Sequence, residues 1–242
     1  MASAAVASPL SFLRRRAGSP AGHGQGRRFP TNCKGLLSDK PSAALCVVVV
    51  LDLDASDYWI CRVGAGSRWE RHGYMLTMYD ANDQPVERHM ARRHGVAAVA
   101  GKVYFEFTGT ALGVVEFDIV DGEPRPKLGL MRVDMVDTPD SLPMSSSYLV
   151  ESRSELFMAI VFFDRHNLYS VAKVAVYRMD FSAALAWHKV QEIGEDRAFL
   201  LGGDRLGISN FGASCSVGEH GLSGNCVYFI LQPMRTFCMS SP

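Results

Sequence analysis

The stretch Gly101-Lys-Val-Tyr-Phe-Glu-Phe107 predicts a β-strand that starts at a glycine turn. Its valine and two phenylalanines alternate with a period of two residues, as in a strand that buries one face. Two later stretches have the same form, a turn followed by a run of apolar and aromatic residues, and they lie at Glu155–Phe163 and Asn225–Phe229. Recurrence of one strand type along the chain predicts a fold built from repeated β-sheets.

Two further strand types recur between these runs. One ends in an acidic stop, as in Val114–Asp118 and Val174–Asp180. The other carries a tryptophan followed by basic or imidazole residues, at Trp69 and Trp187. A repeat of about 40–50 residues that holds four antiparallel strands has the size of a propeller blade. In such a blade the tryptophan is expected to fill the wedge between neighbouring sheets.

Short β segments separated by polar or glycine-rich turns cover most of the chain after residue 30. They are expected at Cys46–Leu53, Tyr58–Val63, Arg68–Tyr74, Val96–Val99, Val103–Phe107, Gly113–Phe117, Leu128–Val133, Leu156–Phe163, Val174–Phe181, Trp187–Ile193, Ala198–Leu201 and Val227–Leu231. Helical signals are weak, and one helical turn is expected at 182–187. The fold class is therefore all-β, a partial (incomplete) β-propeller of about four blades behind a disordered N-terminal leader.

Composition fits a globular protein, with 48% hydrophobic and 21% charged residues in a chain of 242. Residues 1–38 hold six of the 25 basic residues and no acid, so the remaining 19 basic and 25 acidic residues give the rest a net charge of −6. A mildly acidic body argues against nucleic acid as a partner, because binding phosphate needs a basic surface. The longest apolar run, at 43–51, is too short for a membrane span.

Three segments are expected along the chain. Residues 1–29 form a disordered basic leader, which is compatible with an organellar transit peptide. Residues 30–236 form the propeller region, and residues 237–242 form a tail. The expected location is the cytoplasm or nucleus, with the mitochondrion or plastid as the alternative if the leader is a transit peptide.

Three stretches resemble functional motifs but lack essential residues. Asp52–Ser56 begins like a calcium loop, yet Asp57 stands where that loop needs glycine and Val63 stands where it needs glutamate. Gly64–Trp69 begins like a dinucleotide loop but has tryptophan in place of the third glycine, so it is read as a hairpin turn. Ser170 and Lys173 fit a serine–lysine nucleophile pattern, but strand geometry is expected to point them to opposite sides.

Other reactive side chains show no catalytic or metal-binding spacing. The six cysteines form no C-x-x-C pair and are expected to be free, mostly buried thiols in a reducing compartment. The basic stretch Arg88–His94 is read as a solvated loop or, alternatively, as a contact for an acidic partner. No catalytic, cofactor-binding or metal-binding residue is therefore assigned, and no cofactor is expected.

The C-terminal part of the chain carries a block of motifs in a fixed order, at Val174–Phe181, Trp187–Leu200, 202–203, Ser209 and Gly224–Phe229. In this order the chain resembles the plant KIB-type β-propeller family, formerly a domain of unknown function and commonly found behind F-boxes. Upstream stretches such as 32–38 fit the same pattern, so the resemblance covers residues 30–236.

This resemblance implies a propeller whose loops recruit proteins. In F-box members the propeller selects substrates for ubiquitination, while the F-box binds the SKP-type adaptor of a cullin ligase. The leader lacks the periodic apolar helix of an F-box, so the SKP-type adaptor is not expected to bind, and the first blades of a full family domain are expected to be missing. The leading hypothesis is a non-enzymatic, protein-binding scaffold with an unknown protein partner. The alternatives are an organelle-targeted member of the family and an enzyme with a site in the propeller channel.

Overall fold

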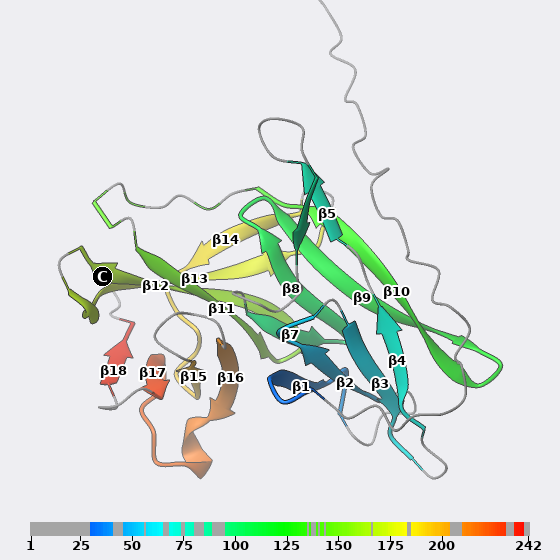
Figure 1. Cartoon of the computed structure of the whole chain (residues 1–242). Helices are drawn as coiled ribbons and strands as arrows, with labels where there is room; N and C mark the ends of the chain where they lie inside the picture. Colours follow the sequence, from blue (N-terminus) through cyan, green and yellow to red (C-terminus); the bar gives the residue numbers. More distant parts are fainter. Residues whose placement is uncertain are drawn as a thin grey trace, which may run out of the picture.

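The chain folds into β-sheets in the computed structural model. The structure describes residues 30–40, 46–55, 57–64, 68–73, 76–79, 85–88, 95–134, 136, 139, 141–142, 144–165, 167–182, 185–203, 210–230 and 235–239. They form four four-stranded sheets and a separate two-stranded hairpin, with no α-helix among them (Figure 1). The same ranges hold no helix that could cross a membrane. The leader expected at 1–29 lies outside the described residues.

Each of the four sheets is one blade, with its innermost strand at the propeller axis. From the axis outward, blade 1 consists of β1 (Cys33–Leu37), β2 (Val47–Asp52), β3 (Asp57–Arg62) and β4 (Glu70–Gly73). In the same order, blade 2 consists of β7 (Val96–Val99), β8 (Lys102–Thr108), β9 (Ala111–Val120) and β10 (Glu123–Arg132). Between them, β5 (Leu76–Tyr79) and β6 (Pro85–Arg88) form the separate hairpin.

The second half of the chain forms the other two blades. From the axis outward, blade 3 consists of β11 (Ser145–Ser152), β12 (Glu155–Asp164), β13 (Asn167–Asp180) and β14 (Ala186–Val190). Blade 4 consists of β16 (Phe211–Ser216), β15 (Arg197–Gly202), β17 (Cys226–Ile230) and β18 (Arg235–Cys238). Every expected β segment overlaps one of these strands. The helical turn expected at 182–187 is wrong at its end, because Ala186 and Trp187 belong to β14.

The innermost strands of adjacent blades run in the same direction along the propeller axis. The Asn210 side-chain amide donates to the carbonyl oxygen of Ser147 across 3.0 Å, and further along the same two strands the hydroxyls of Ser152 and Ser214 lie 2.9 Å apart. Residue numbers rise together on both strands, so β11 and β16 are parallel. We call the face where the innermost strands begin the top face, and the face where they end the bottom face.

Glycines allow these innermost strands to approach closely. A Cβ atom at Gly212 in β16 would lie 2.8 Å from the carbonyl oxygen of Leu149 in β11. A Cβ atom at Gly95, just before β7, would collide with the backbone nitrogen of the same leucine. Such contacts leave no room for large side chains, so glycine and serine occupy these positions. The innermost strands therefore lack, at these positions, the apolar alternation by which a strand is recognised in the sequence.

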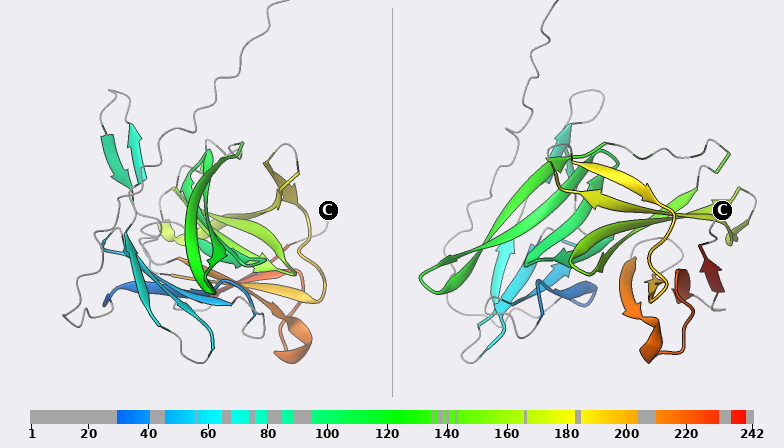
Figure 2. Two further views of the ribbon diagram at one scale, coloured as in Figure 1. Left: turned by 90° about the vertical axis from the view of Figure 1, so that its right-hand side faces the viewer. Right: turned by 180° about the vertical axis from the view of Figure 1, so that it is seen from behind.

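The blades pack face to face, because three apolar clusters each join two neighbouring blades. The strand next to the innermost one carries a fully buried phenylalanine in three blades, namely Phe105, Phe162 and Phe199. Phe199 of blade 4 meets Phe157 of blade 3 edge to face, with ring centroids 5.4 Å apart. Burial of apolar area of this kind stabilises the fold by about 25 cal/mol per Å². The expected all-β propeller of four blades is confirmed (Figure 2).

Tryptophan does not fill the wedge at Trp69, contrary to expectation. Its side chain precedes the outermost strand of blade 1 and is 41% exposed. Trp187 lies on the outermost strand of blade 3, where it packs at the margin of the apolar cluster that joins blades 2 and 3. On the strands next to the innermost ones, the buried rings between blades are instead those of Phe105, Phe162 and Phe199.

Blade 4 departs from the expected antiparallel pattern. Its strand β15 pairs antiparallel with β16 on one side but parallel with β17 on the other. A crossover through the short 3-10 helix η1 (Val217–Glu219) makes this connection at the bottom face. Because the crossover loop passes directly over the turn before β15, a Cβ atom at Gly224 would collide with the carbonyl oxygen of Glu195.

Asn225 holds the crossover to both of its neighbours. Its side-chain oxygen accepts the backbone N–H of Ile193 (2.9 Å), and its side-chain nitrogen donates to the carbonyl oxygen of Met239 (3.0 Å). Its φ of 53° lies in the left-handed region, which asparagine tolerates better than most residues. These contacts explain the Gly-Asn pair in the Gly224–Phe229 motif.

The cysteines only partly match the expectation of free thiols. Cys33, Cys46, Cys61 and Cys215 are free, with Cys33 exposed. Cys226, however, is disulfide-bonded, so the expectation is wrong there. The antiparallel register of β17 and β18 places position 238, also a cysteine, opposite Cys226. Directly opposed positions in paired strands lie within the range that a disulfide spans, a closeness that linear spacing does not reveal.

Candidate functional site

A polar cluster lies at the propeller axis near the top face. The Lys34 ammonium donates to the carbonyl oxygen of Asn210 across 2.7 Å, and the Asn210 side chain donates to the carbonyl oxygen of Ser147. The Ser147 hydroxyl is hydrogen-bonded to the Glu106 carboxylate. Since these four residues come from blades 1, 4, 3 and 2 respectively, the cluster connects the innermost parts of the blades.

The axial cluster is suited to holding blades together. Its ammonium is bonded to a backbone oxygen and its carboxylate to a hydroxyl. Asn210 is only 1% exposed, and its side-chain oxygen lacks a hydrogen-bond partner within the described part of the chain. A buried acceptor of this kind is commonly satisfied by one ordered water molecule.

Large apolar side chains with substantial exposure lie at the ends of strands in the described part of the chain. Two are on the top face: Met144 and Phe211. Six are on the bottom face: Leu37, Val63, Trp69, Ile119, Val120 and Phe181. Strand ends and the loops beyond them are where a rigid scaffold presents contact residues, so these two faces are the candidate binding surfaces.

The β9–β10 hairpin projects beyond its blade on the bottom face (Figure 2). Strand β8 pairs with β9 as far as Val103 opposite Val115, whereas β9 continues to Val120 with β10 as its partner. At the base of the projection the Lys102 ammonium lies 2.6 Å from the Glu116 carboxylate. This hydrogen bond raises the pKa of Lys102, while partial burial opposes the rise.

Two contacts hold the projecting hairpin against blade 1. The Arg62 guanidinium donates to the carbonyl oxygen of Gly122 across 2.9 Å, and the Arg125 guanidinium lies 3.4 Å from the Glu70 carboxylate. Arg62 is followed by the exposed Val63, and Glu70 is preceded by Trp69. The exposed apolar groups of blade 1 therefore lie beside the contacts that fix the hairpin.

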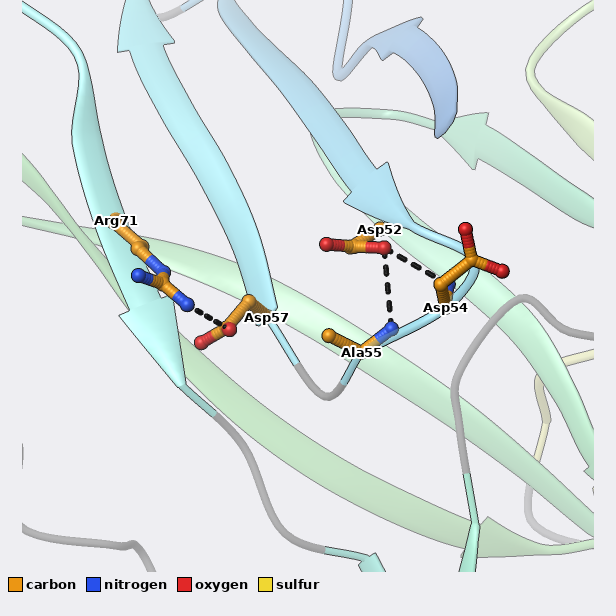
Figure 3. Close-up of polar contacts among 5 residues, drawn as sticks. All are labelled: Asp52, Asp54, Ala55, Asp57 and Arg71. Carbon is orange, nitrogen blue, oxygen red and sulfur yellow. Dashed lines mark hydrogen bonds and ion pairs between the residues drawn. The ribbon is translucent and has the colours of Figure 1, made fainter. Parts of the chain in front are cut away.

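The segment that resembles a calcium loop forms a turn. Figure 3 shows one carboxylate oxygen of Asp52 accepting hydrogen bonds from the backbone amides of Asp54 (2.8 Å) and Ala55 (3.1 Å). Asp57 begins β3 and pairs instead with Arg71 on the neighbouring strand (Figure 3). The carboxylates thus have separate partners. Across the described ranges, no three His, Cys, Asp or Glu side chains are arranged to hold a metal ion.

The remaining motifs fall on strands or outside the described residues. Gly64 follows β3, which pairs antiparallel with β4, so the hairpin reading is confirmed, while 65–67 lie outside the described residues. Ser170 and Lys173 both lie in β13, but a register shift between Lys173 and Val171 interrupts the strict alternation from which opposite sides were expected. In the basic stretch, Arg88 ends β6 and residues 89–94 lie outside the described residues.

Sequence reasoning assigned no site residue, and it missed both the axial cluster and the projecting hairpin. Lys34 and Asn210 are 176 residues apart, and nothing local signals their contact. The hairpin did have a signal, because Asp121-Gly122 between two apolar runs is a strong mark of a two-residue turn.

The family model of the KIB1-4 beta-propeller matches residues 9–238. The match spans the four blades and begins within the stretch expected to be a leader. No curated protein matches the chain, and no solved structure does. Since the match covers most of the chain and the observed fold is a propeller, the chain belongs to the KIB1-4 beta-propeller family.

Proposed function

We propose that the chain is a protein-binding propeller scaffold without catalytic activity, similar in role to the substrate-recognition propellers of plant F-box proteins. The observation that carries the proposal is the placement of exposed apolar side chains at strand ends on the two faces. Exposed apolar and aromatic groups of this kind commonly anchor protein partners. Rigid blades hold such groups in place before a partner arrives, which lowers the entropy lost on binding.

The axis supports this proposal over an enzyme in the channel. A catalytic site there would need acids, a nucleophile or a metal to converge from several blades. The carboxylate of Glu106 and the ammonium of Lys34 instead make contacts that join blades. We therefore assign recognition to the faces and a structural role to the axis.

Affinity capture of the full chain from plant extract, followed by mass spectrometry, tests the proposal. We expect at least one protein to be enriched over a beads-only control, and the purified protein to bind the chain in calorimetry. The adaptor and cullin subunits are scored in the same experiment, and their recovery would add a ligase role. Failure to enrich any protein would overturn the proposal, and turnover of a small molecule by the purified chain would favour an enzyme instead.

A further inference from the structure

The projecting hairpin ends in a tip that differs in character from the rest of its blade. We define the hairpin tip as residues Asp118–Glu123. It contains three carboxylates, two apolar side chains, one glycine and no basic residue. A binding role for this tip rests on the proposed protein-binding function and makes that function more specific.

The register of the hairpin sorts the tip residues onto two faces. Val120 lies opposite Glu123, and Asp118 lies two residues before Val120, so these three side chains share one face. Ile119 points to the other face. The side chains of Val120 and Ile119 are 47% and 41% exposed, so each face of the tip presents an apolar group to solvent.

The tip carries more acidic than basic charge, since its three carboxylates have one basic residue of the hairpin, Arg125, directly across the strands from them. Asp118, Asp121 and Glu123 are exposed and make no ion pair within the described part of the chain. Arg125 of the hairpin stands opposite Asp118 in the register, but its guanidinium lies 3.4 Å from the carboxylate of Glu70 in blade 1, and Arg62 of blade 1 donates to the carbonyl oxygen of Gly122. Three like charges around apolar groups favour a partner of positive charge.

The tip is also fixed in one conformation. Asp121 and Gly122 have φ values of 53° and 79°, which fit a type I′ turn that matches the twist of the two strands. A free two-stranded ribbon is only marginally stable, but here the contacts of Arg62 and Arg125 hold it against blade 1. Phe117 still packs against the cluster between blades 1 and 2, whereas residues 118–123 beyond it are all exposed and therefore available for recognition.

We propose that the hairpin tip inserts into an apolar cleft with a rim of lysine or arginine on a partner protein. The convex ribbon carries apolar groups on both faces, and a cleft can contact both at once where a flat surface cannot. The carboxylates of Asp118 and Glu123 flank Val120 and pair with the basic rim. Charge complementarity between the tip and the rim selects this partner over a neutral apolar surface.

The test uses the full chain and the protein recovered by affinity capture. Isothermal titration calorimetry compares the wild-type chain with Ile119→Ser/Val120→Ser, and a second titration at two salt concentrations uses Asp118→Asn/Glu123→Gln. The truncation control is Lys189→Ser, since Lys189 is exposed on β14 of blade 3 and belongs to neither group of exposed apolar side chains. The charge control is Glu195→Gln/Glu219→Gln, two exposed acids of blade 4. A photo-cross-linker at position 120 identifies the contacted peptide.

We expect the apolar double variant to bind at least about tenfold more weakly and the acid variant to lose most of the salt dependence, with both controls near wild type. The cross-linked peptide should contain lysine or arginine near apolar residues. Unchanged affinity in the tip variants would overturn the inference and leave the proposed function standing. A cross-link to a second copy or to the chain itself would also overturn it. Failure to capture any protein would overturn the proposed function as well.

Discussion

The Lys34 ammonium lies 2.7 Å from the carbonyl oxygen of Asn210 and joins the first described blade to the fourth. The contact runs from β1 to the residue that precedes β16, so it links blade 1 to blade 4 at the axis. Charged donors to backbone oxygens form some of the stronger hydrogen bonds in proteins. The contact therefore couples the stability of blade 4 to that of blade 1.

Replacing Lys34 with methionine should lower the free energy of unfolding by about 1.5–3 kcal/mol, because methionine keeps the apolar stem and removes the charged donor. Urea unfolding followed by fluorescence measures the change. Lys127→Met is the control, since Lys127 is exposed on β10, and it should stay within about 0.5 kcal/mol of wild type. Equal effects of the two variants would show that the contact does not tie the blades.

Substituting alanine at Gly212 should destabilise the fold, because its Cβ atom would press against the carbonyl oxygen of Leu149. We expect a loss of about 1–3 kcal/mol, as for other overpacked sites. Gly35→Ala in β1 is the matched control, since nothing lies within 4 Å of its Cβ atom. That variant should be neutral or more stable by about 0.4–1 kcal/mol through the unfolded chain. Thermal unfolding of both variants decides between close packing at the axis and a loose channel.

The strands that sequence reasoning missed show how axis packing hides a strand. Three of the four innermost strands, β1, β11 and β16, were not expected, whereas the buried strands next to them were. At the axis, backbone meets backbone, so β11 begins with three serines and β16 contains Gly212. Period-two alternation signals a face against a side-chain core, and these strands have no such face at those positions.

The binding surfaces were still less visible in the sequence. Individual exposed residues such as Val120 read as ordinary members of an apolar strand. The register shows that β9 continues past β8, and the contacts of Arg62 with Gly122 and of Arg125 with Glu70 show where the hairpin lies. Sequence therefore predicted the fold class and most strands, but it could not predict contacts between blades because these depend on residues far apart in the chain.

The charge of Asp180 should stabilise the fold at neutral pH and not in acid. The backbone N–H and hydroxyl of Ser182 hold the pKa of Asp180 below its usual 3.8, and His188 and Arg178 lower it further. A folded pKa below the unfolded one means that the contribution is complete above the unfolded pKa and is lost as pH falls through the folded pKa. We expect the stability difference between wild type and Asp180→Asn to shrink between about pH 5 and about pH 2. Urea unfolding across this range measures it, and a gap that does not change with pH would contradict the prediction.

Asn225 should be the most sensitive polar residue of blade 4, because it combines two side-chain hydrogen bonds with a φ of 53°. Asn225→Ala removes both bonds and adds backbone strain, so we expect a loss of about 2–4 kcal/mol. Asn225→Gly removes the same bonds but accepts the positive φ, and it should be more stable than the alanine variant by about 1 kcal/mol. Asn32→Ala, at an exposed asparagine bonded to Asp54, serves as the control and should change stability by less than about 0.5 kcal/mol. Chemical denaturation ranks the four proteins. If glycine and alanine at position 225 proved equally destabilising, the left-handed backbone would not be what the asparagine accommodates.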